Sequence, residues 1–253
     1  TNKQALEYLF MQGDLMVSNR NNFHKVYDLT ERVLPKSINT TLPTPKEYAR
    51  FLIIRYLQAN VLGQINEITY LLKNIKPVVS TVLHEMLLNK ELIKVNIKES
   101  IYYILPDSLD LLGKQLTRSR LKILSPFDNL LIQCKRMQTL FNFDYLIECY
   151  TPKEKRKYSY FSLPILWDGR LVARMVCKVE REKSILHIKH LALESYLKKM
   201  DDFAFALIKE FILFLKFNNC KYIELHRTTP INFKPFLQNM INISFFHNDL
   251  RRS

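Results

Sequence analysis

Glycine is scarce in this sequence, with 4 residues among 253. A loop that cradles nucleotide phosphates needs closely spaced glycines, and neither GxGxxG nor GxxxxGKS or GxxxxGKT occurs. The same scarcity excludes collagen-like repeats and flexible Gly-rich linkers. We therefore predict no phosphate-binding loop and no small-molecule cofactor.

Cysteine pairs and long hydrophobic runs are also missing. No two cysteines form a CxxC pair, so neither a structural zinc site nor a disulfide framework is expected. The most apolar stretch, residues 203–217, is interrupted by Lys209 and Glu210 and is too short and too charged to span a bilayer. We predict no membrane-spanning segment and four reduced, buried thiols: Cys134, Cys149, Cys177 and Cys220.

Acidic residues are few relative to basic ones. The chain has 24 Asp and Glu against 38 Lys and Arg, a formal net charge of +14. An excess of this size indicates a polyanionic partner, nucleic acid first and an anionic membrane surface second. Solubility alone is the plain alternative, although smaller charges already keep small domains soluble.

The N-terminal region has the pattern of a helix followed by a hairpin. Residues 2–12 have helical spacing and Gly13 fits the position after the helix end, while residues 14–18 and 23–29 alternate as strands. This order matches the back half of a winged helix, in which a recognition helix precedes the wing. We predict this half-module over residues 1–34 and a Pro-, Ser- and Thr-rich linker over 35–45.

Residues 46–108 predict a second, more complete winged helix. Three helices are expected, from about 45 to 59, from 65 to 72, and from 78 to 89 behind Pro77, which suits a first helical turn. A hairpin over 92–95 and 101–105 then follows.

Residues 109–253 change in character from helices to strands. After a short helical linker, strands are predicted over the five segments 141–148, 158–166, 170–179, 185–191 and 221–226. The dipeptide Asp168-Gly169 is typical of a two-residue type I′ hairpin turn. An apolar helix over 203–217, capped by Asp201 or Asp202, should be buried against the sheet, and residues 228–253 show no clear periodicity. The predicted fold class is α+β: tandem winged-helix modules, the first partial, followed by a β-barrel-like antiparallel domain with a buried C-terminal helix.

Several linked motifs carry a family resemblance. They are ALEYLF (5–10), GDLMV (13–17), YDLTERVLP (27–35), LSPFD (124–128), LFNFDY (140–145) and ECYTPKEKR (148–156), followed by the hairpin from LP (163–164) to LVAR (171–174). In order and spacing the chain resembles the winged-helix DNA glycosylases that repair alkylated purines and interstrand crosslinks. The resemblance runs from residue 3 to about 190 and covers only the C-terminal two-thirds of the family pattern.

The resemblance implies a reaction as well as a fold. Family members wrap duplex DNA and hydrolyse the N-glycosidic bond of N3- or N7-alkylated purines, using a Gln-x-Gln or Gln-x-Asp pair in the first winged helix. That motif lies upstream of everything that matches here, so we predict no catalytic residue and no metal ligand in this chain. The nearest local similarity, Gln64-Ile65-Asn66, falls where a helix is expected to begin. Two departures from the family pattern are Ile132-Gln133-Cys134 in place of Trp-Asp-Arg, and Val176 in place of an acidic residue.

Basic side chains in two regions are the predicted DNA-binding residues, because phosphate contacts supply most of the affinity for duplex DNA. A polar hairpin turn and a solvated charge run are the alternative interpretations of these two regions. The candidates are Arg20, Asn22, His24, Lys25, Lys114, Arg118, Arg120, Lys122, Lys153, Lys155, Arg156 and Lys157.

Other chemistry is not indicated. His187 and His190 are three residues apart on a predicted strand, which places them on opposite faces, so the histidines predict no metal site. Phe141, Phe143 and Tyr145 are expected in the core rather than on a base-stacking surface.

Three functions stay open. The leading hypothesis is the DNA-binding portion of a repair glycosylase, a cytoplasmic, nucleoid-associated monomer that binds damaged duplex DNA. The alternatives are a non-enzymatic winged-helix regulator, which would favour one operator sequence, and a protein-interaction module, which would show no salt-sensitive DNA binding.

Overall fold

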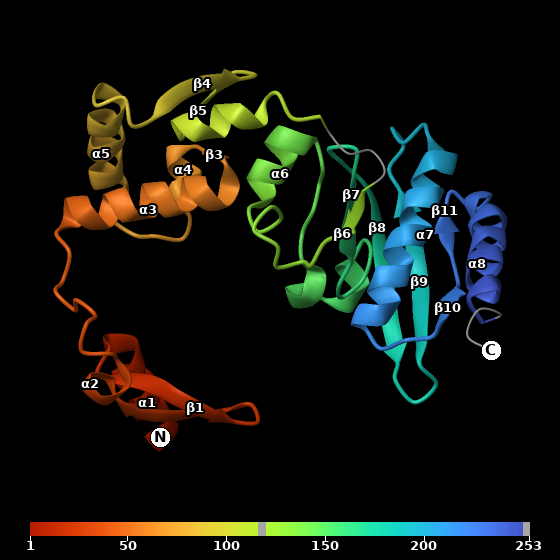
Figure 1. Cartoon of the computed structure of the whole chain (residues 1–253), viewed down its shortest axis with the longest axis horizontal. Helices are drawn as coiled ribbons and strands as arrows, with labels where there is room; N and C mark the ends of the chain where they lie inside the picture. The colour runs from red at the N-terminus through yellow and green to blue at the C-terminus, as the bar shows by residue number, and fades with distance from the viewer. Residues whose placement is uncertain (116–119, 250–253) are drawn as a thin grey trace. The chain divides into compact units, whose positions relative to one another are not determined.

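A computed structural model describes residues 1–115 and 120–249, and the chain has a mixed α+β fold (Figure 1). The contacts divide it into two compact units, Thr1–Tyr48 and Ala49–Ser253. Among the described residues, no helix combines the length and apolar composition needed to cross a membrane. The predicted DNA-binding residue Arg118 lies outside the described residues.

The first unit contains a helix and a hairpin, as the sequence predicts. Helix α1 (Asn2–Gln12) ends at Gly13, whose φ of 93° is a left-handed conformation that favours glycine. Strands β1 (Leu15–Asn21) and β2 (His24–Leu29) pair antiparallel, and β1 extends further towards the turn than predicted, so that only Asn22 and Phe23 form the turn. A one-turn helix, α2 (Thr30–Val33), follows.

The second unit begins with three helices and a small sheet. Helices α3 (Pro45–Asn60), α4 (Ile65–Ile68) and α5 (Lys76–Leu88) pack around a core that includes Ile53, Leu57 and Leu83. Strands β3 (Leu62–Gly63), β4 (Ile93–Ile97) and β5 (Ser100–Ile104) form a sheet in the order β3-β5-β4, and the 3₁₀ helix η1 (Pro106–Leu111) follows.

Helix α4 is shorter than predicted. It has four residues, and the positive φ of 60° at Leu71 prevents the helix from continuing to residue 72. By contrast, Pro77 lies in the first turn of α5, which confirms its predicted place.

A curled, half-barrel sheet forms the centre of the second unit. Strands β6 (Leu121–Ile123), β7 (Leu163–Trp167), β8 (Arg170–Glu180), β9 (Ile185–Leu193) and β10 (Tyr222–Leu225) follow the order β10-β9-β8-β7-β6, and β11 (Thr228–Thr229) also pairs with β9. The turn between β7 and β8 has φ values of 49° at Asp168 and 72° at Gly169, as a type I′ turn requires.

The prediction of a wholly antiparallel sheet is wrong at one edge. Strands β10 and β11 both run parallel to β9. The chain passes through a helix between β9 and β10, and a helical crossover of this kind returns the next strand in the same direction.

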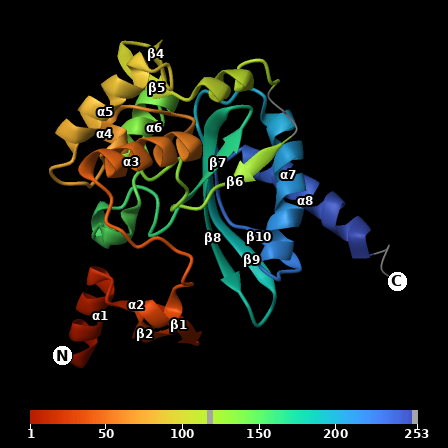
Figure 2. The same ribbon diagram turned by 60° about the vertical axis from the view of Figure 1, so that its left-hand side comes forward.

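Helices α7 (Met200–Phe217) and α8 (Phe233–Asp249) lie on one face of the sheet (Figure 2). The prediction that α7 is buried is wrong for its outer side, where Phe205 is 61% and Phe217 82% exposed. Its N-cap is Lys199, so Asp201 and Asp202 lie in the first turn rather than capping the helix.

Helix α8 is not predicted from the sequence. Phe233, Leu237 and Ile241 of this helix recur at intervals of four and are buried in the same core cluster as the buried residues of α7. Polar residues between them obscure the pattern in the sequence.

The strand predicted over residues 141–148 does not form. Helix α6 (Cys134–Phe141) covers the start of this segment and ends at Asn142, which has a left-handed φ of 50°. The alternation is nevertheless real, because Phe143 and Tyr145 point into the core while their neighbours are exposed. This confirms the core assignment of those two rings, and Phe141 is partly buried.

All four cysteine thiols are free. The expectation that they are buried is wrong for Cys134, which is exposed on α6, and only partly right for the other three, which are half-buried.

Candidate nucleic-acid interface

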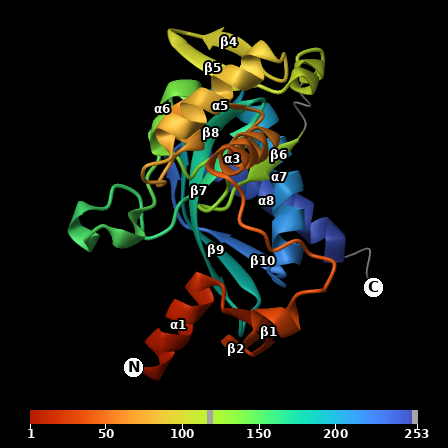
Figure 3. The same ribbon diagram turned by 90° about the vertical axis from the view of Figure 1, so that its left-hand side faces the viewer.

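A loop in which a run of basic residues is flanked by aromatic residues is a distinctive surface of the second unit. It comprises residues 148–161, which contain the 3₁₀ turns η2 (Glu148–Tyr150) and η3 (Lys153–Lys155), and is called the basic-aromatic loop below. The loop belongs to the green segment between α6 and β7, which extends to one side of the sheet (Figure 3). Lys153, Lys155 and Lys157 are exposed and Arg156 is half-buried, so four predicted DNA-binding residues are close together.

Glu148 holds the loop in its conformation. Its buried carboxylate accepts backbone N–H groups from Lys157 at 2.5 Å, Tyr158 at 2.9 Å and Ser159 at 3.0 Å. Burial alone would raise the pKa of Glu148, but these three donors and the positive charge of Arg156 outweigh it and lower the pKa below 4.5. The carboxylate therefore holds the backbone of residues 157–159 next to Glu148, and the basic residues 153–157 lie in the segment between these two points.

Replacing Glu148 by Gln should loosen this loop. Because the folded-state pKa is depressed, the ionised carboxylate contributes its full stability above about pH 4.5 and loses it as the pH falls through the folded value. One hydrogen bond to a charged group contributes about 1.5–3 kcal/mol. Gln keeps one acceptor oxygen, so urea unfolding at pH 7 should show Glu148→Gln destabilised by about the contribution of one such bond. The difference from the wild type should shrink below pH 4.5, and a Glu148→Gln variant as stable as the wild type at pH 7 would refute this role. Glu154→Gln, which changes an exposed carboxylate in the same loop, should have little effect.

Arg174 on β8 anchors the other end of the loop. Its guanidinium donates two hydrogen bonds to Glu194, at 2.7 and 2.9 Å, and one to the carbonyl of Asp144 at 2.9 Å. It also lies between the rings of Phe143 and Tyr158, 4.2 Å from each centroid. A buried arginine stacked in this way fixes the position of Tyr158, the residue that follows the basic run.

Exposed rings accompany the basic side chains. Tyr150 is 93% exposed and Phe127 is 64% exposed, and Phe127 lies edge-on to Phe161 at 6.3 Å. Tyr160 contacts Phe161 at 4.7 Å and carries the guanidinium of Arg156 above its ring at 5.1 Å. Such rings can stack on bases or sugars beside lysines that contact phosphates. Tyr160 lies next to the basic run in the sequence and is expected beside it, whereas Tyr150, Phe127 and Phe161 are not predicted from the sequence as part of this surface.

The remaining candidates of the second unit are dispersed. Lys114 and Arg120 are exposed. Lys122 on β6 is held 3.1 Å from Glu210 of α7, and this ion pair offsets its charge. Lys122 is therefore a weaker candidate than the lysines of the basic-aromatic loop.

The candidates of the first unit lie along its hairpin. Asn22 is in the turn with a φ of 54°, and Arg20 is paired across the strands with Lys25. Arg20, Asn22 and His24 are exposed, and the ammonium group of Lys25 lies 4.5 Å above the ring of Phe10. The hairpin thus presents polar and basic side chains at its tip.

The segment that resembles a catalytic motif is structural. Gln64 is the N-cap of α4, and its N–H donates to the Glu67 carboxylate at 3.0 Å, which confirms the prediction of a helix start. Gln133, in the segment that departs from the family pattern, donates to the Glu67 carbonyl at 3.0 Å and to the Tyr56 hydroxyl at 3.3 Å. Gln133 therefore connects the start of α6 to helices α3 and α4.

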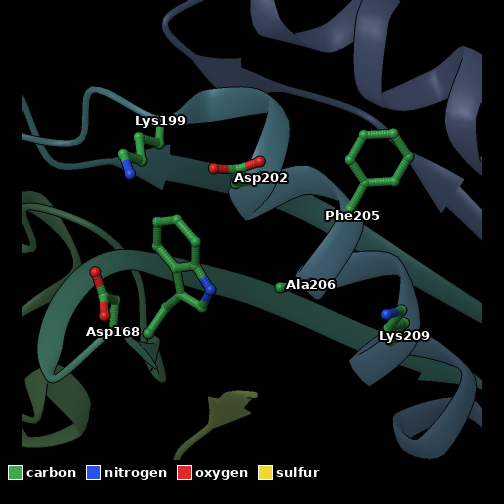
Figure 4. Close-up of a pocket in the computed structure, with 7 residues that line it drawn as sticks. Asp168, Lys199, Asp202, Phe205, Ala206 and Lys209 are labelled. Atoms are coloured by element: carbon green, nitrogen blue, oxygen red, sulfur yellow. The ribbon is translucent and has the colours of Figure 1, made fainter. Parts of the chain in front are cut away.

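A separate pocket of about 240 Å³ lies between the β7–β8 turn and the start of α7 (Figure 4). This volume is below that of pockets that enclose drug-sized ligands. Lysine and aspartate side chains both line it, so it has no excess of positive charge for a phosphate. Its lining residues are Trp167, Asp168, Lys199, Asp202, Phe205, Ala206 and Lys209.

Two histidines that are far apart in the sequence lie close together on the sheet. The rings of His187 and His226 are 5.3 Å apart, and Glu180 and Glu224 contact His187. His190 lies apart from this group and contacts the Thr229 hydroxyl at 2.9 Å. Sequence reasoning paired histidines that are close along one strand, whereas the sheet brings together residues 39 positions apart.

A family model identifies the family of this chain, and a solved structure has a similar fold. A family model described as "DNA glycosylase AlkZ-like" matches residues 1–209, and the chain belongs to this family. A solved structure of the DNA glycosylase AlkZ from Streptomyces sahachiroi is similar in fold, with a TM-score of 0.51 and 16% sequence identity. The similarity covers 79% of this chain and 53% of that one, so this chain spans about half the length of the AlkZ structure.

Proposed function

We propose that this chain is the DNA-binding portion of a repair glycosylase that hydrolyses N-glycosidic bonds of alkylated or crosslinked purines. The basic-aromatic loop is the observation that carries the proposal, because it combines exposed lysines with exposed rings on a rigid support. Membership in the AlkZ-like family makes DNA the expected polyanion, in agreement with the net charge of +14.

The domain organisation is part of the proposal. Residues 46–108 act as a winged helix, since three helices precede the β4–β5 hairpin and β3 adds a third strand. Residues 1–34 supply a recognition helix and its wing, residues 35–45 are the linker, and residues 109–253 carry the basic-aromatic loop. The chain works as a monomer on chromosomal DNA.

The chemistry of base release is assigned to residues outside this chain. A nucleobase already made a good leaving group by alkylation needs a positioned water and stabilisation of positive charge on the sugar. The family's Gln-x-Gln or Gln-x-Asp pair performs these tasks, and Gln64 is occupied as a helix cap. The role of this chain is therefore to hold the duplex.

Charge reversal in the basic-aromatic loop tests this role. Lys153→Glu combined with Lys155→Glu should weaken binding of a random 20-base-pair duplex by about tenfold or more. The plot of log affinity against log salt should also lose about 2 from its slope, about one unit for each lost phosphate contact. Fluorescence anisotropy of the labelled duplex over a range of salt concentrations measures both quantities.

The control makes the same change in net charge outside the basic-aromatic loop. Lys209→Glu combined with Lys216→Glu alters two exposed lysines of α7 and should leave the slope nearly unchanged. Equal effects of the two double variants would mean that binding follows net charge alone, and the loop assignment would be lost. Strong preference for one duplex sequence over random and alkylated DNA would instead favour a winged-helix regulator.

A further inference from the structure

The pairing of β9 with β10 creates a cluster of nitrogen and oxygen ligands on the sheet. In this parallel pair His187 lies opposite Glu224, and the backbone N–H of His226 donates to the Ile188 carbonyl at 2.9 Å. Glu224 lies in β10 and His226 directly follows its last residue, and side chains two residues apart along an extended chain project from the same face. The cluster thus depends on backbone register rather than on one side-chain rotamer.

The ligand atoms converge at spacings suited to a metal ion. His187 Nδ1 is 3.1 Å from His226 Nε2 and 3.0 Å from Glu224 Oε2, and His226 Nε2 is 3.6 Å from Glu224 Oε1. Tetrahedral zinc has ligand bonds of about 2.0–2.2 Å, which places neighbouring ligand atoms roughly 3.3 Å apart. The three observed distances lie on both sides of this value.

A second carboxylate, that of Glu180, contacts the nitrogen of His187 that faces away from the other ligands. Glu180 at the end of β8 contacts His187 Nε2 at 2.8 Å. When Nε2 carries the proton and donates it to Glu180, the lone pair of Nδ1 points towards Glu224 and His226. A carboxylate that orients a metal-binding imidazole in this way is a regular feature of protein metal sites.

We propose that His187, His226 and Glu224 bind a divalent transition metal ion of the zinc type, with Glu180 as the residue that orients His187. Two imidazoles and one carboxylate are a donor set for zinc, and the fourth position is left for water. Lys189 now lies 3.2 Å from His226 Nε2, and because it is exposed its flexible side chain can turn into solvent when the ion binds. The ion would tie the edge strand β10 to β9.

Zinc titration of the whole purified chain, freed of metal and of any affinity tag, tests the site. Isothermal calorimetry should show one equivalent of Zn²⁺, and Co²⁺ should give the visible absorption of a tetrahedral complex. Glu180→Gln should weaken zinc binding by about 10–100-fold, and His187→Ala should weaken it further. His190→Ala removes a histidine of the same strand from outside the cluster and should leave the affinity unchanged.

Two results of the zinc titration would overturn the proposed metal site. Absence of zinc binding by the wild type would overturn the proposal and leave only the contacts of His187 with Glu180 and Glu224. Undiminished binding by His187→Ala would place the ion elsewhere and would also overturn it. If His187→Ala is poorly folded by circular dichroism, the Glu180→Gln and His190→Ala pair decides instead.

Discussion

Replacing Arg136 by Ala should lower the free energy of unfolding of the second unit by about 3–5 kcal/mol. Arg136 of α6 is buried and donates to the Glu67 carboxylate at 2.6 Å. It also donates to the backbone carbonyls of Leu62 at 3.0 Å and Asn60 at 3.1 Å. Removing the guanidinium leaves a buried carboxylate and two part-buried carbonyls without this donor, and the effect is therefore large. Urea unfolding at pH 7, followed by circular dichroism, measures it.

A neighbouring residue provides the control for this variant. Lys135→Ala changes an exposed side chain one position away on the same helix and should alter stability by less than about 0.5 kcal/mol. The double variant Arg136→Met with Glu67→Gln should recover part of the loss, because no unpaired charge is then buried. A loss below 1 kcal/mol for Arg136→Ala would show that the ion pair does not join α6 to the helical part of the unit.

The second large effect is expected at Arg174. Arg174→Ala removes both hydrogen bonds to Glu194 and the cation between Phe143 and Tyr158, and we expect a loss of about 3–5 kcal/mol. Arg174→Lys keeps the charge but not the planar fork, so it should restore only part of the stability. The same urea unfolding experiment measures both variants, and affinity for duplex DNA should fall with Arg174→Ala because the basic-aromatic loop loses its anchor.

Arg170 is the matched control on the same strand. Arg170→Ala removes an exposed arginine at the start of β8 and should change stability by about 0.5 kcal/mol or less. If Arg174→Lys were as stable as the wild type, charge alone would suffice at this position and the stacked geometry would not matter.

Local signals predicted much of this fold. Gly13 ends α1, Pro77 begins α5 and Asp168-Gly169 makes a hairpin turn, because each conformation depends on the residues at the turn or helix end. The prediction failed for residues 141–148, where buried Phe143 and Tyr145 alternate without a partner strand. Alternation reports which side chains are buried, whereas a strand also needs backbone partners that only the tertiary structure supplies.

The candidate sites also differ in whether the local sequence or the tertiary structure determines them. Lys153 and Lys155 can be recognised in the sequence because they belong to a short segment with several basic residues. Their support by Arg174 depends on the packing of β8 against a distant loop. The pair His187 and His226 depends on the parallel register of β9 and β10, which no spacing in the sequence encodes.

Salt dependence of duplex DNA binding by the whole chain is the most direct test of the DNA-binding role. If the four basic residues of the basic-aromatic loop contact phosphates, log affinity against log salt should have a slope of about −3 to −4. Affinity should then fall by about 100-fold between 50 and 200 mM salt. Affinity that is independent of salt, or no binding of plain or alkylated duplex at 50 mM, would contradict the account.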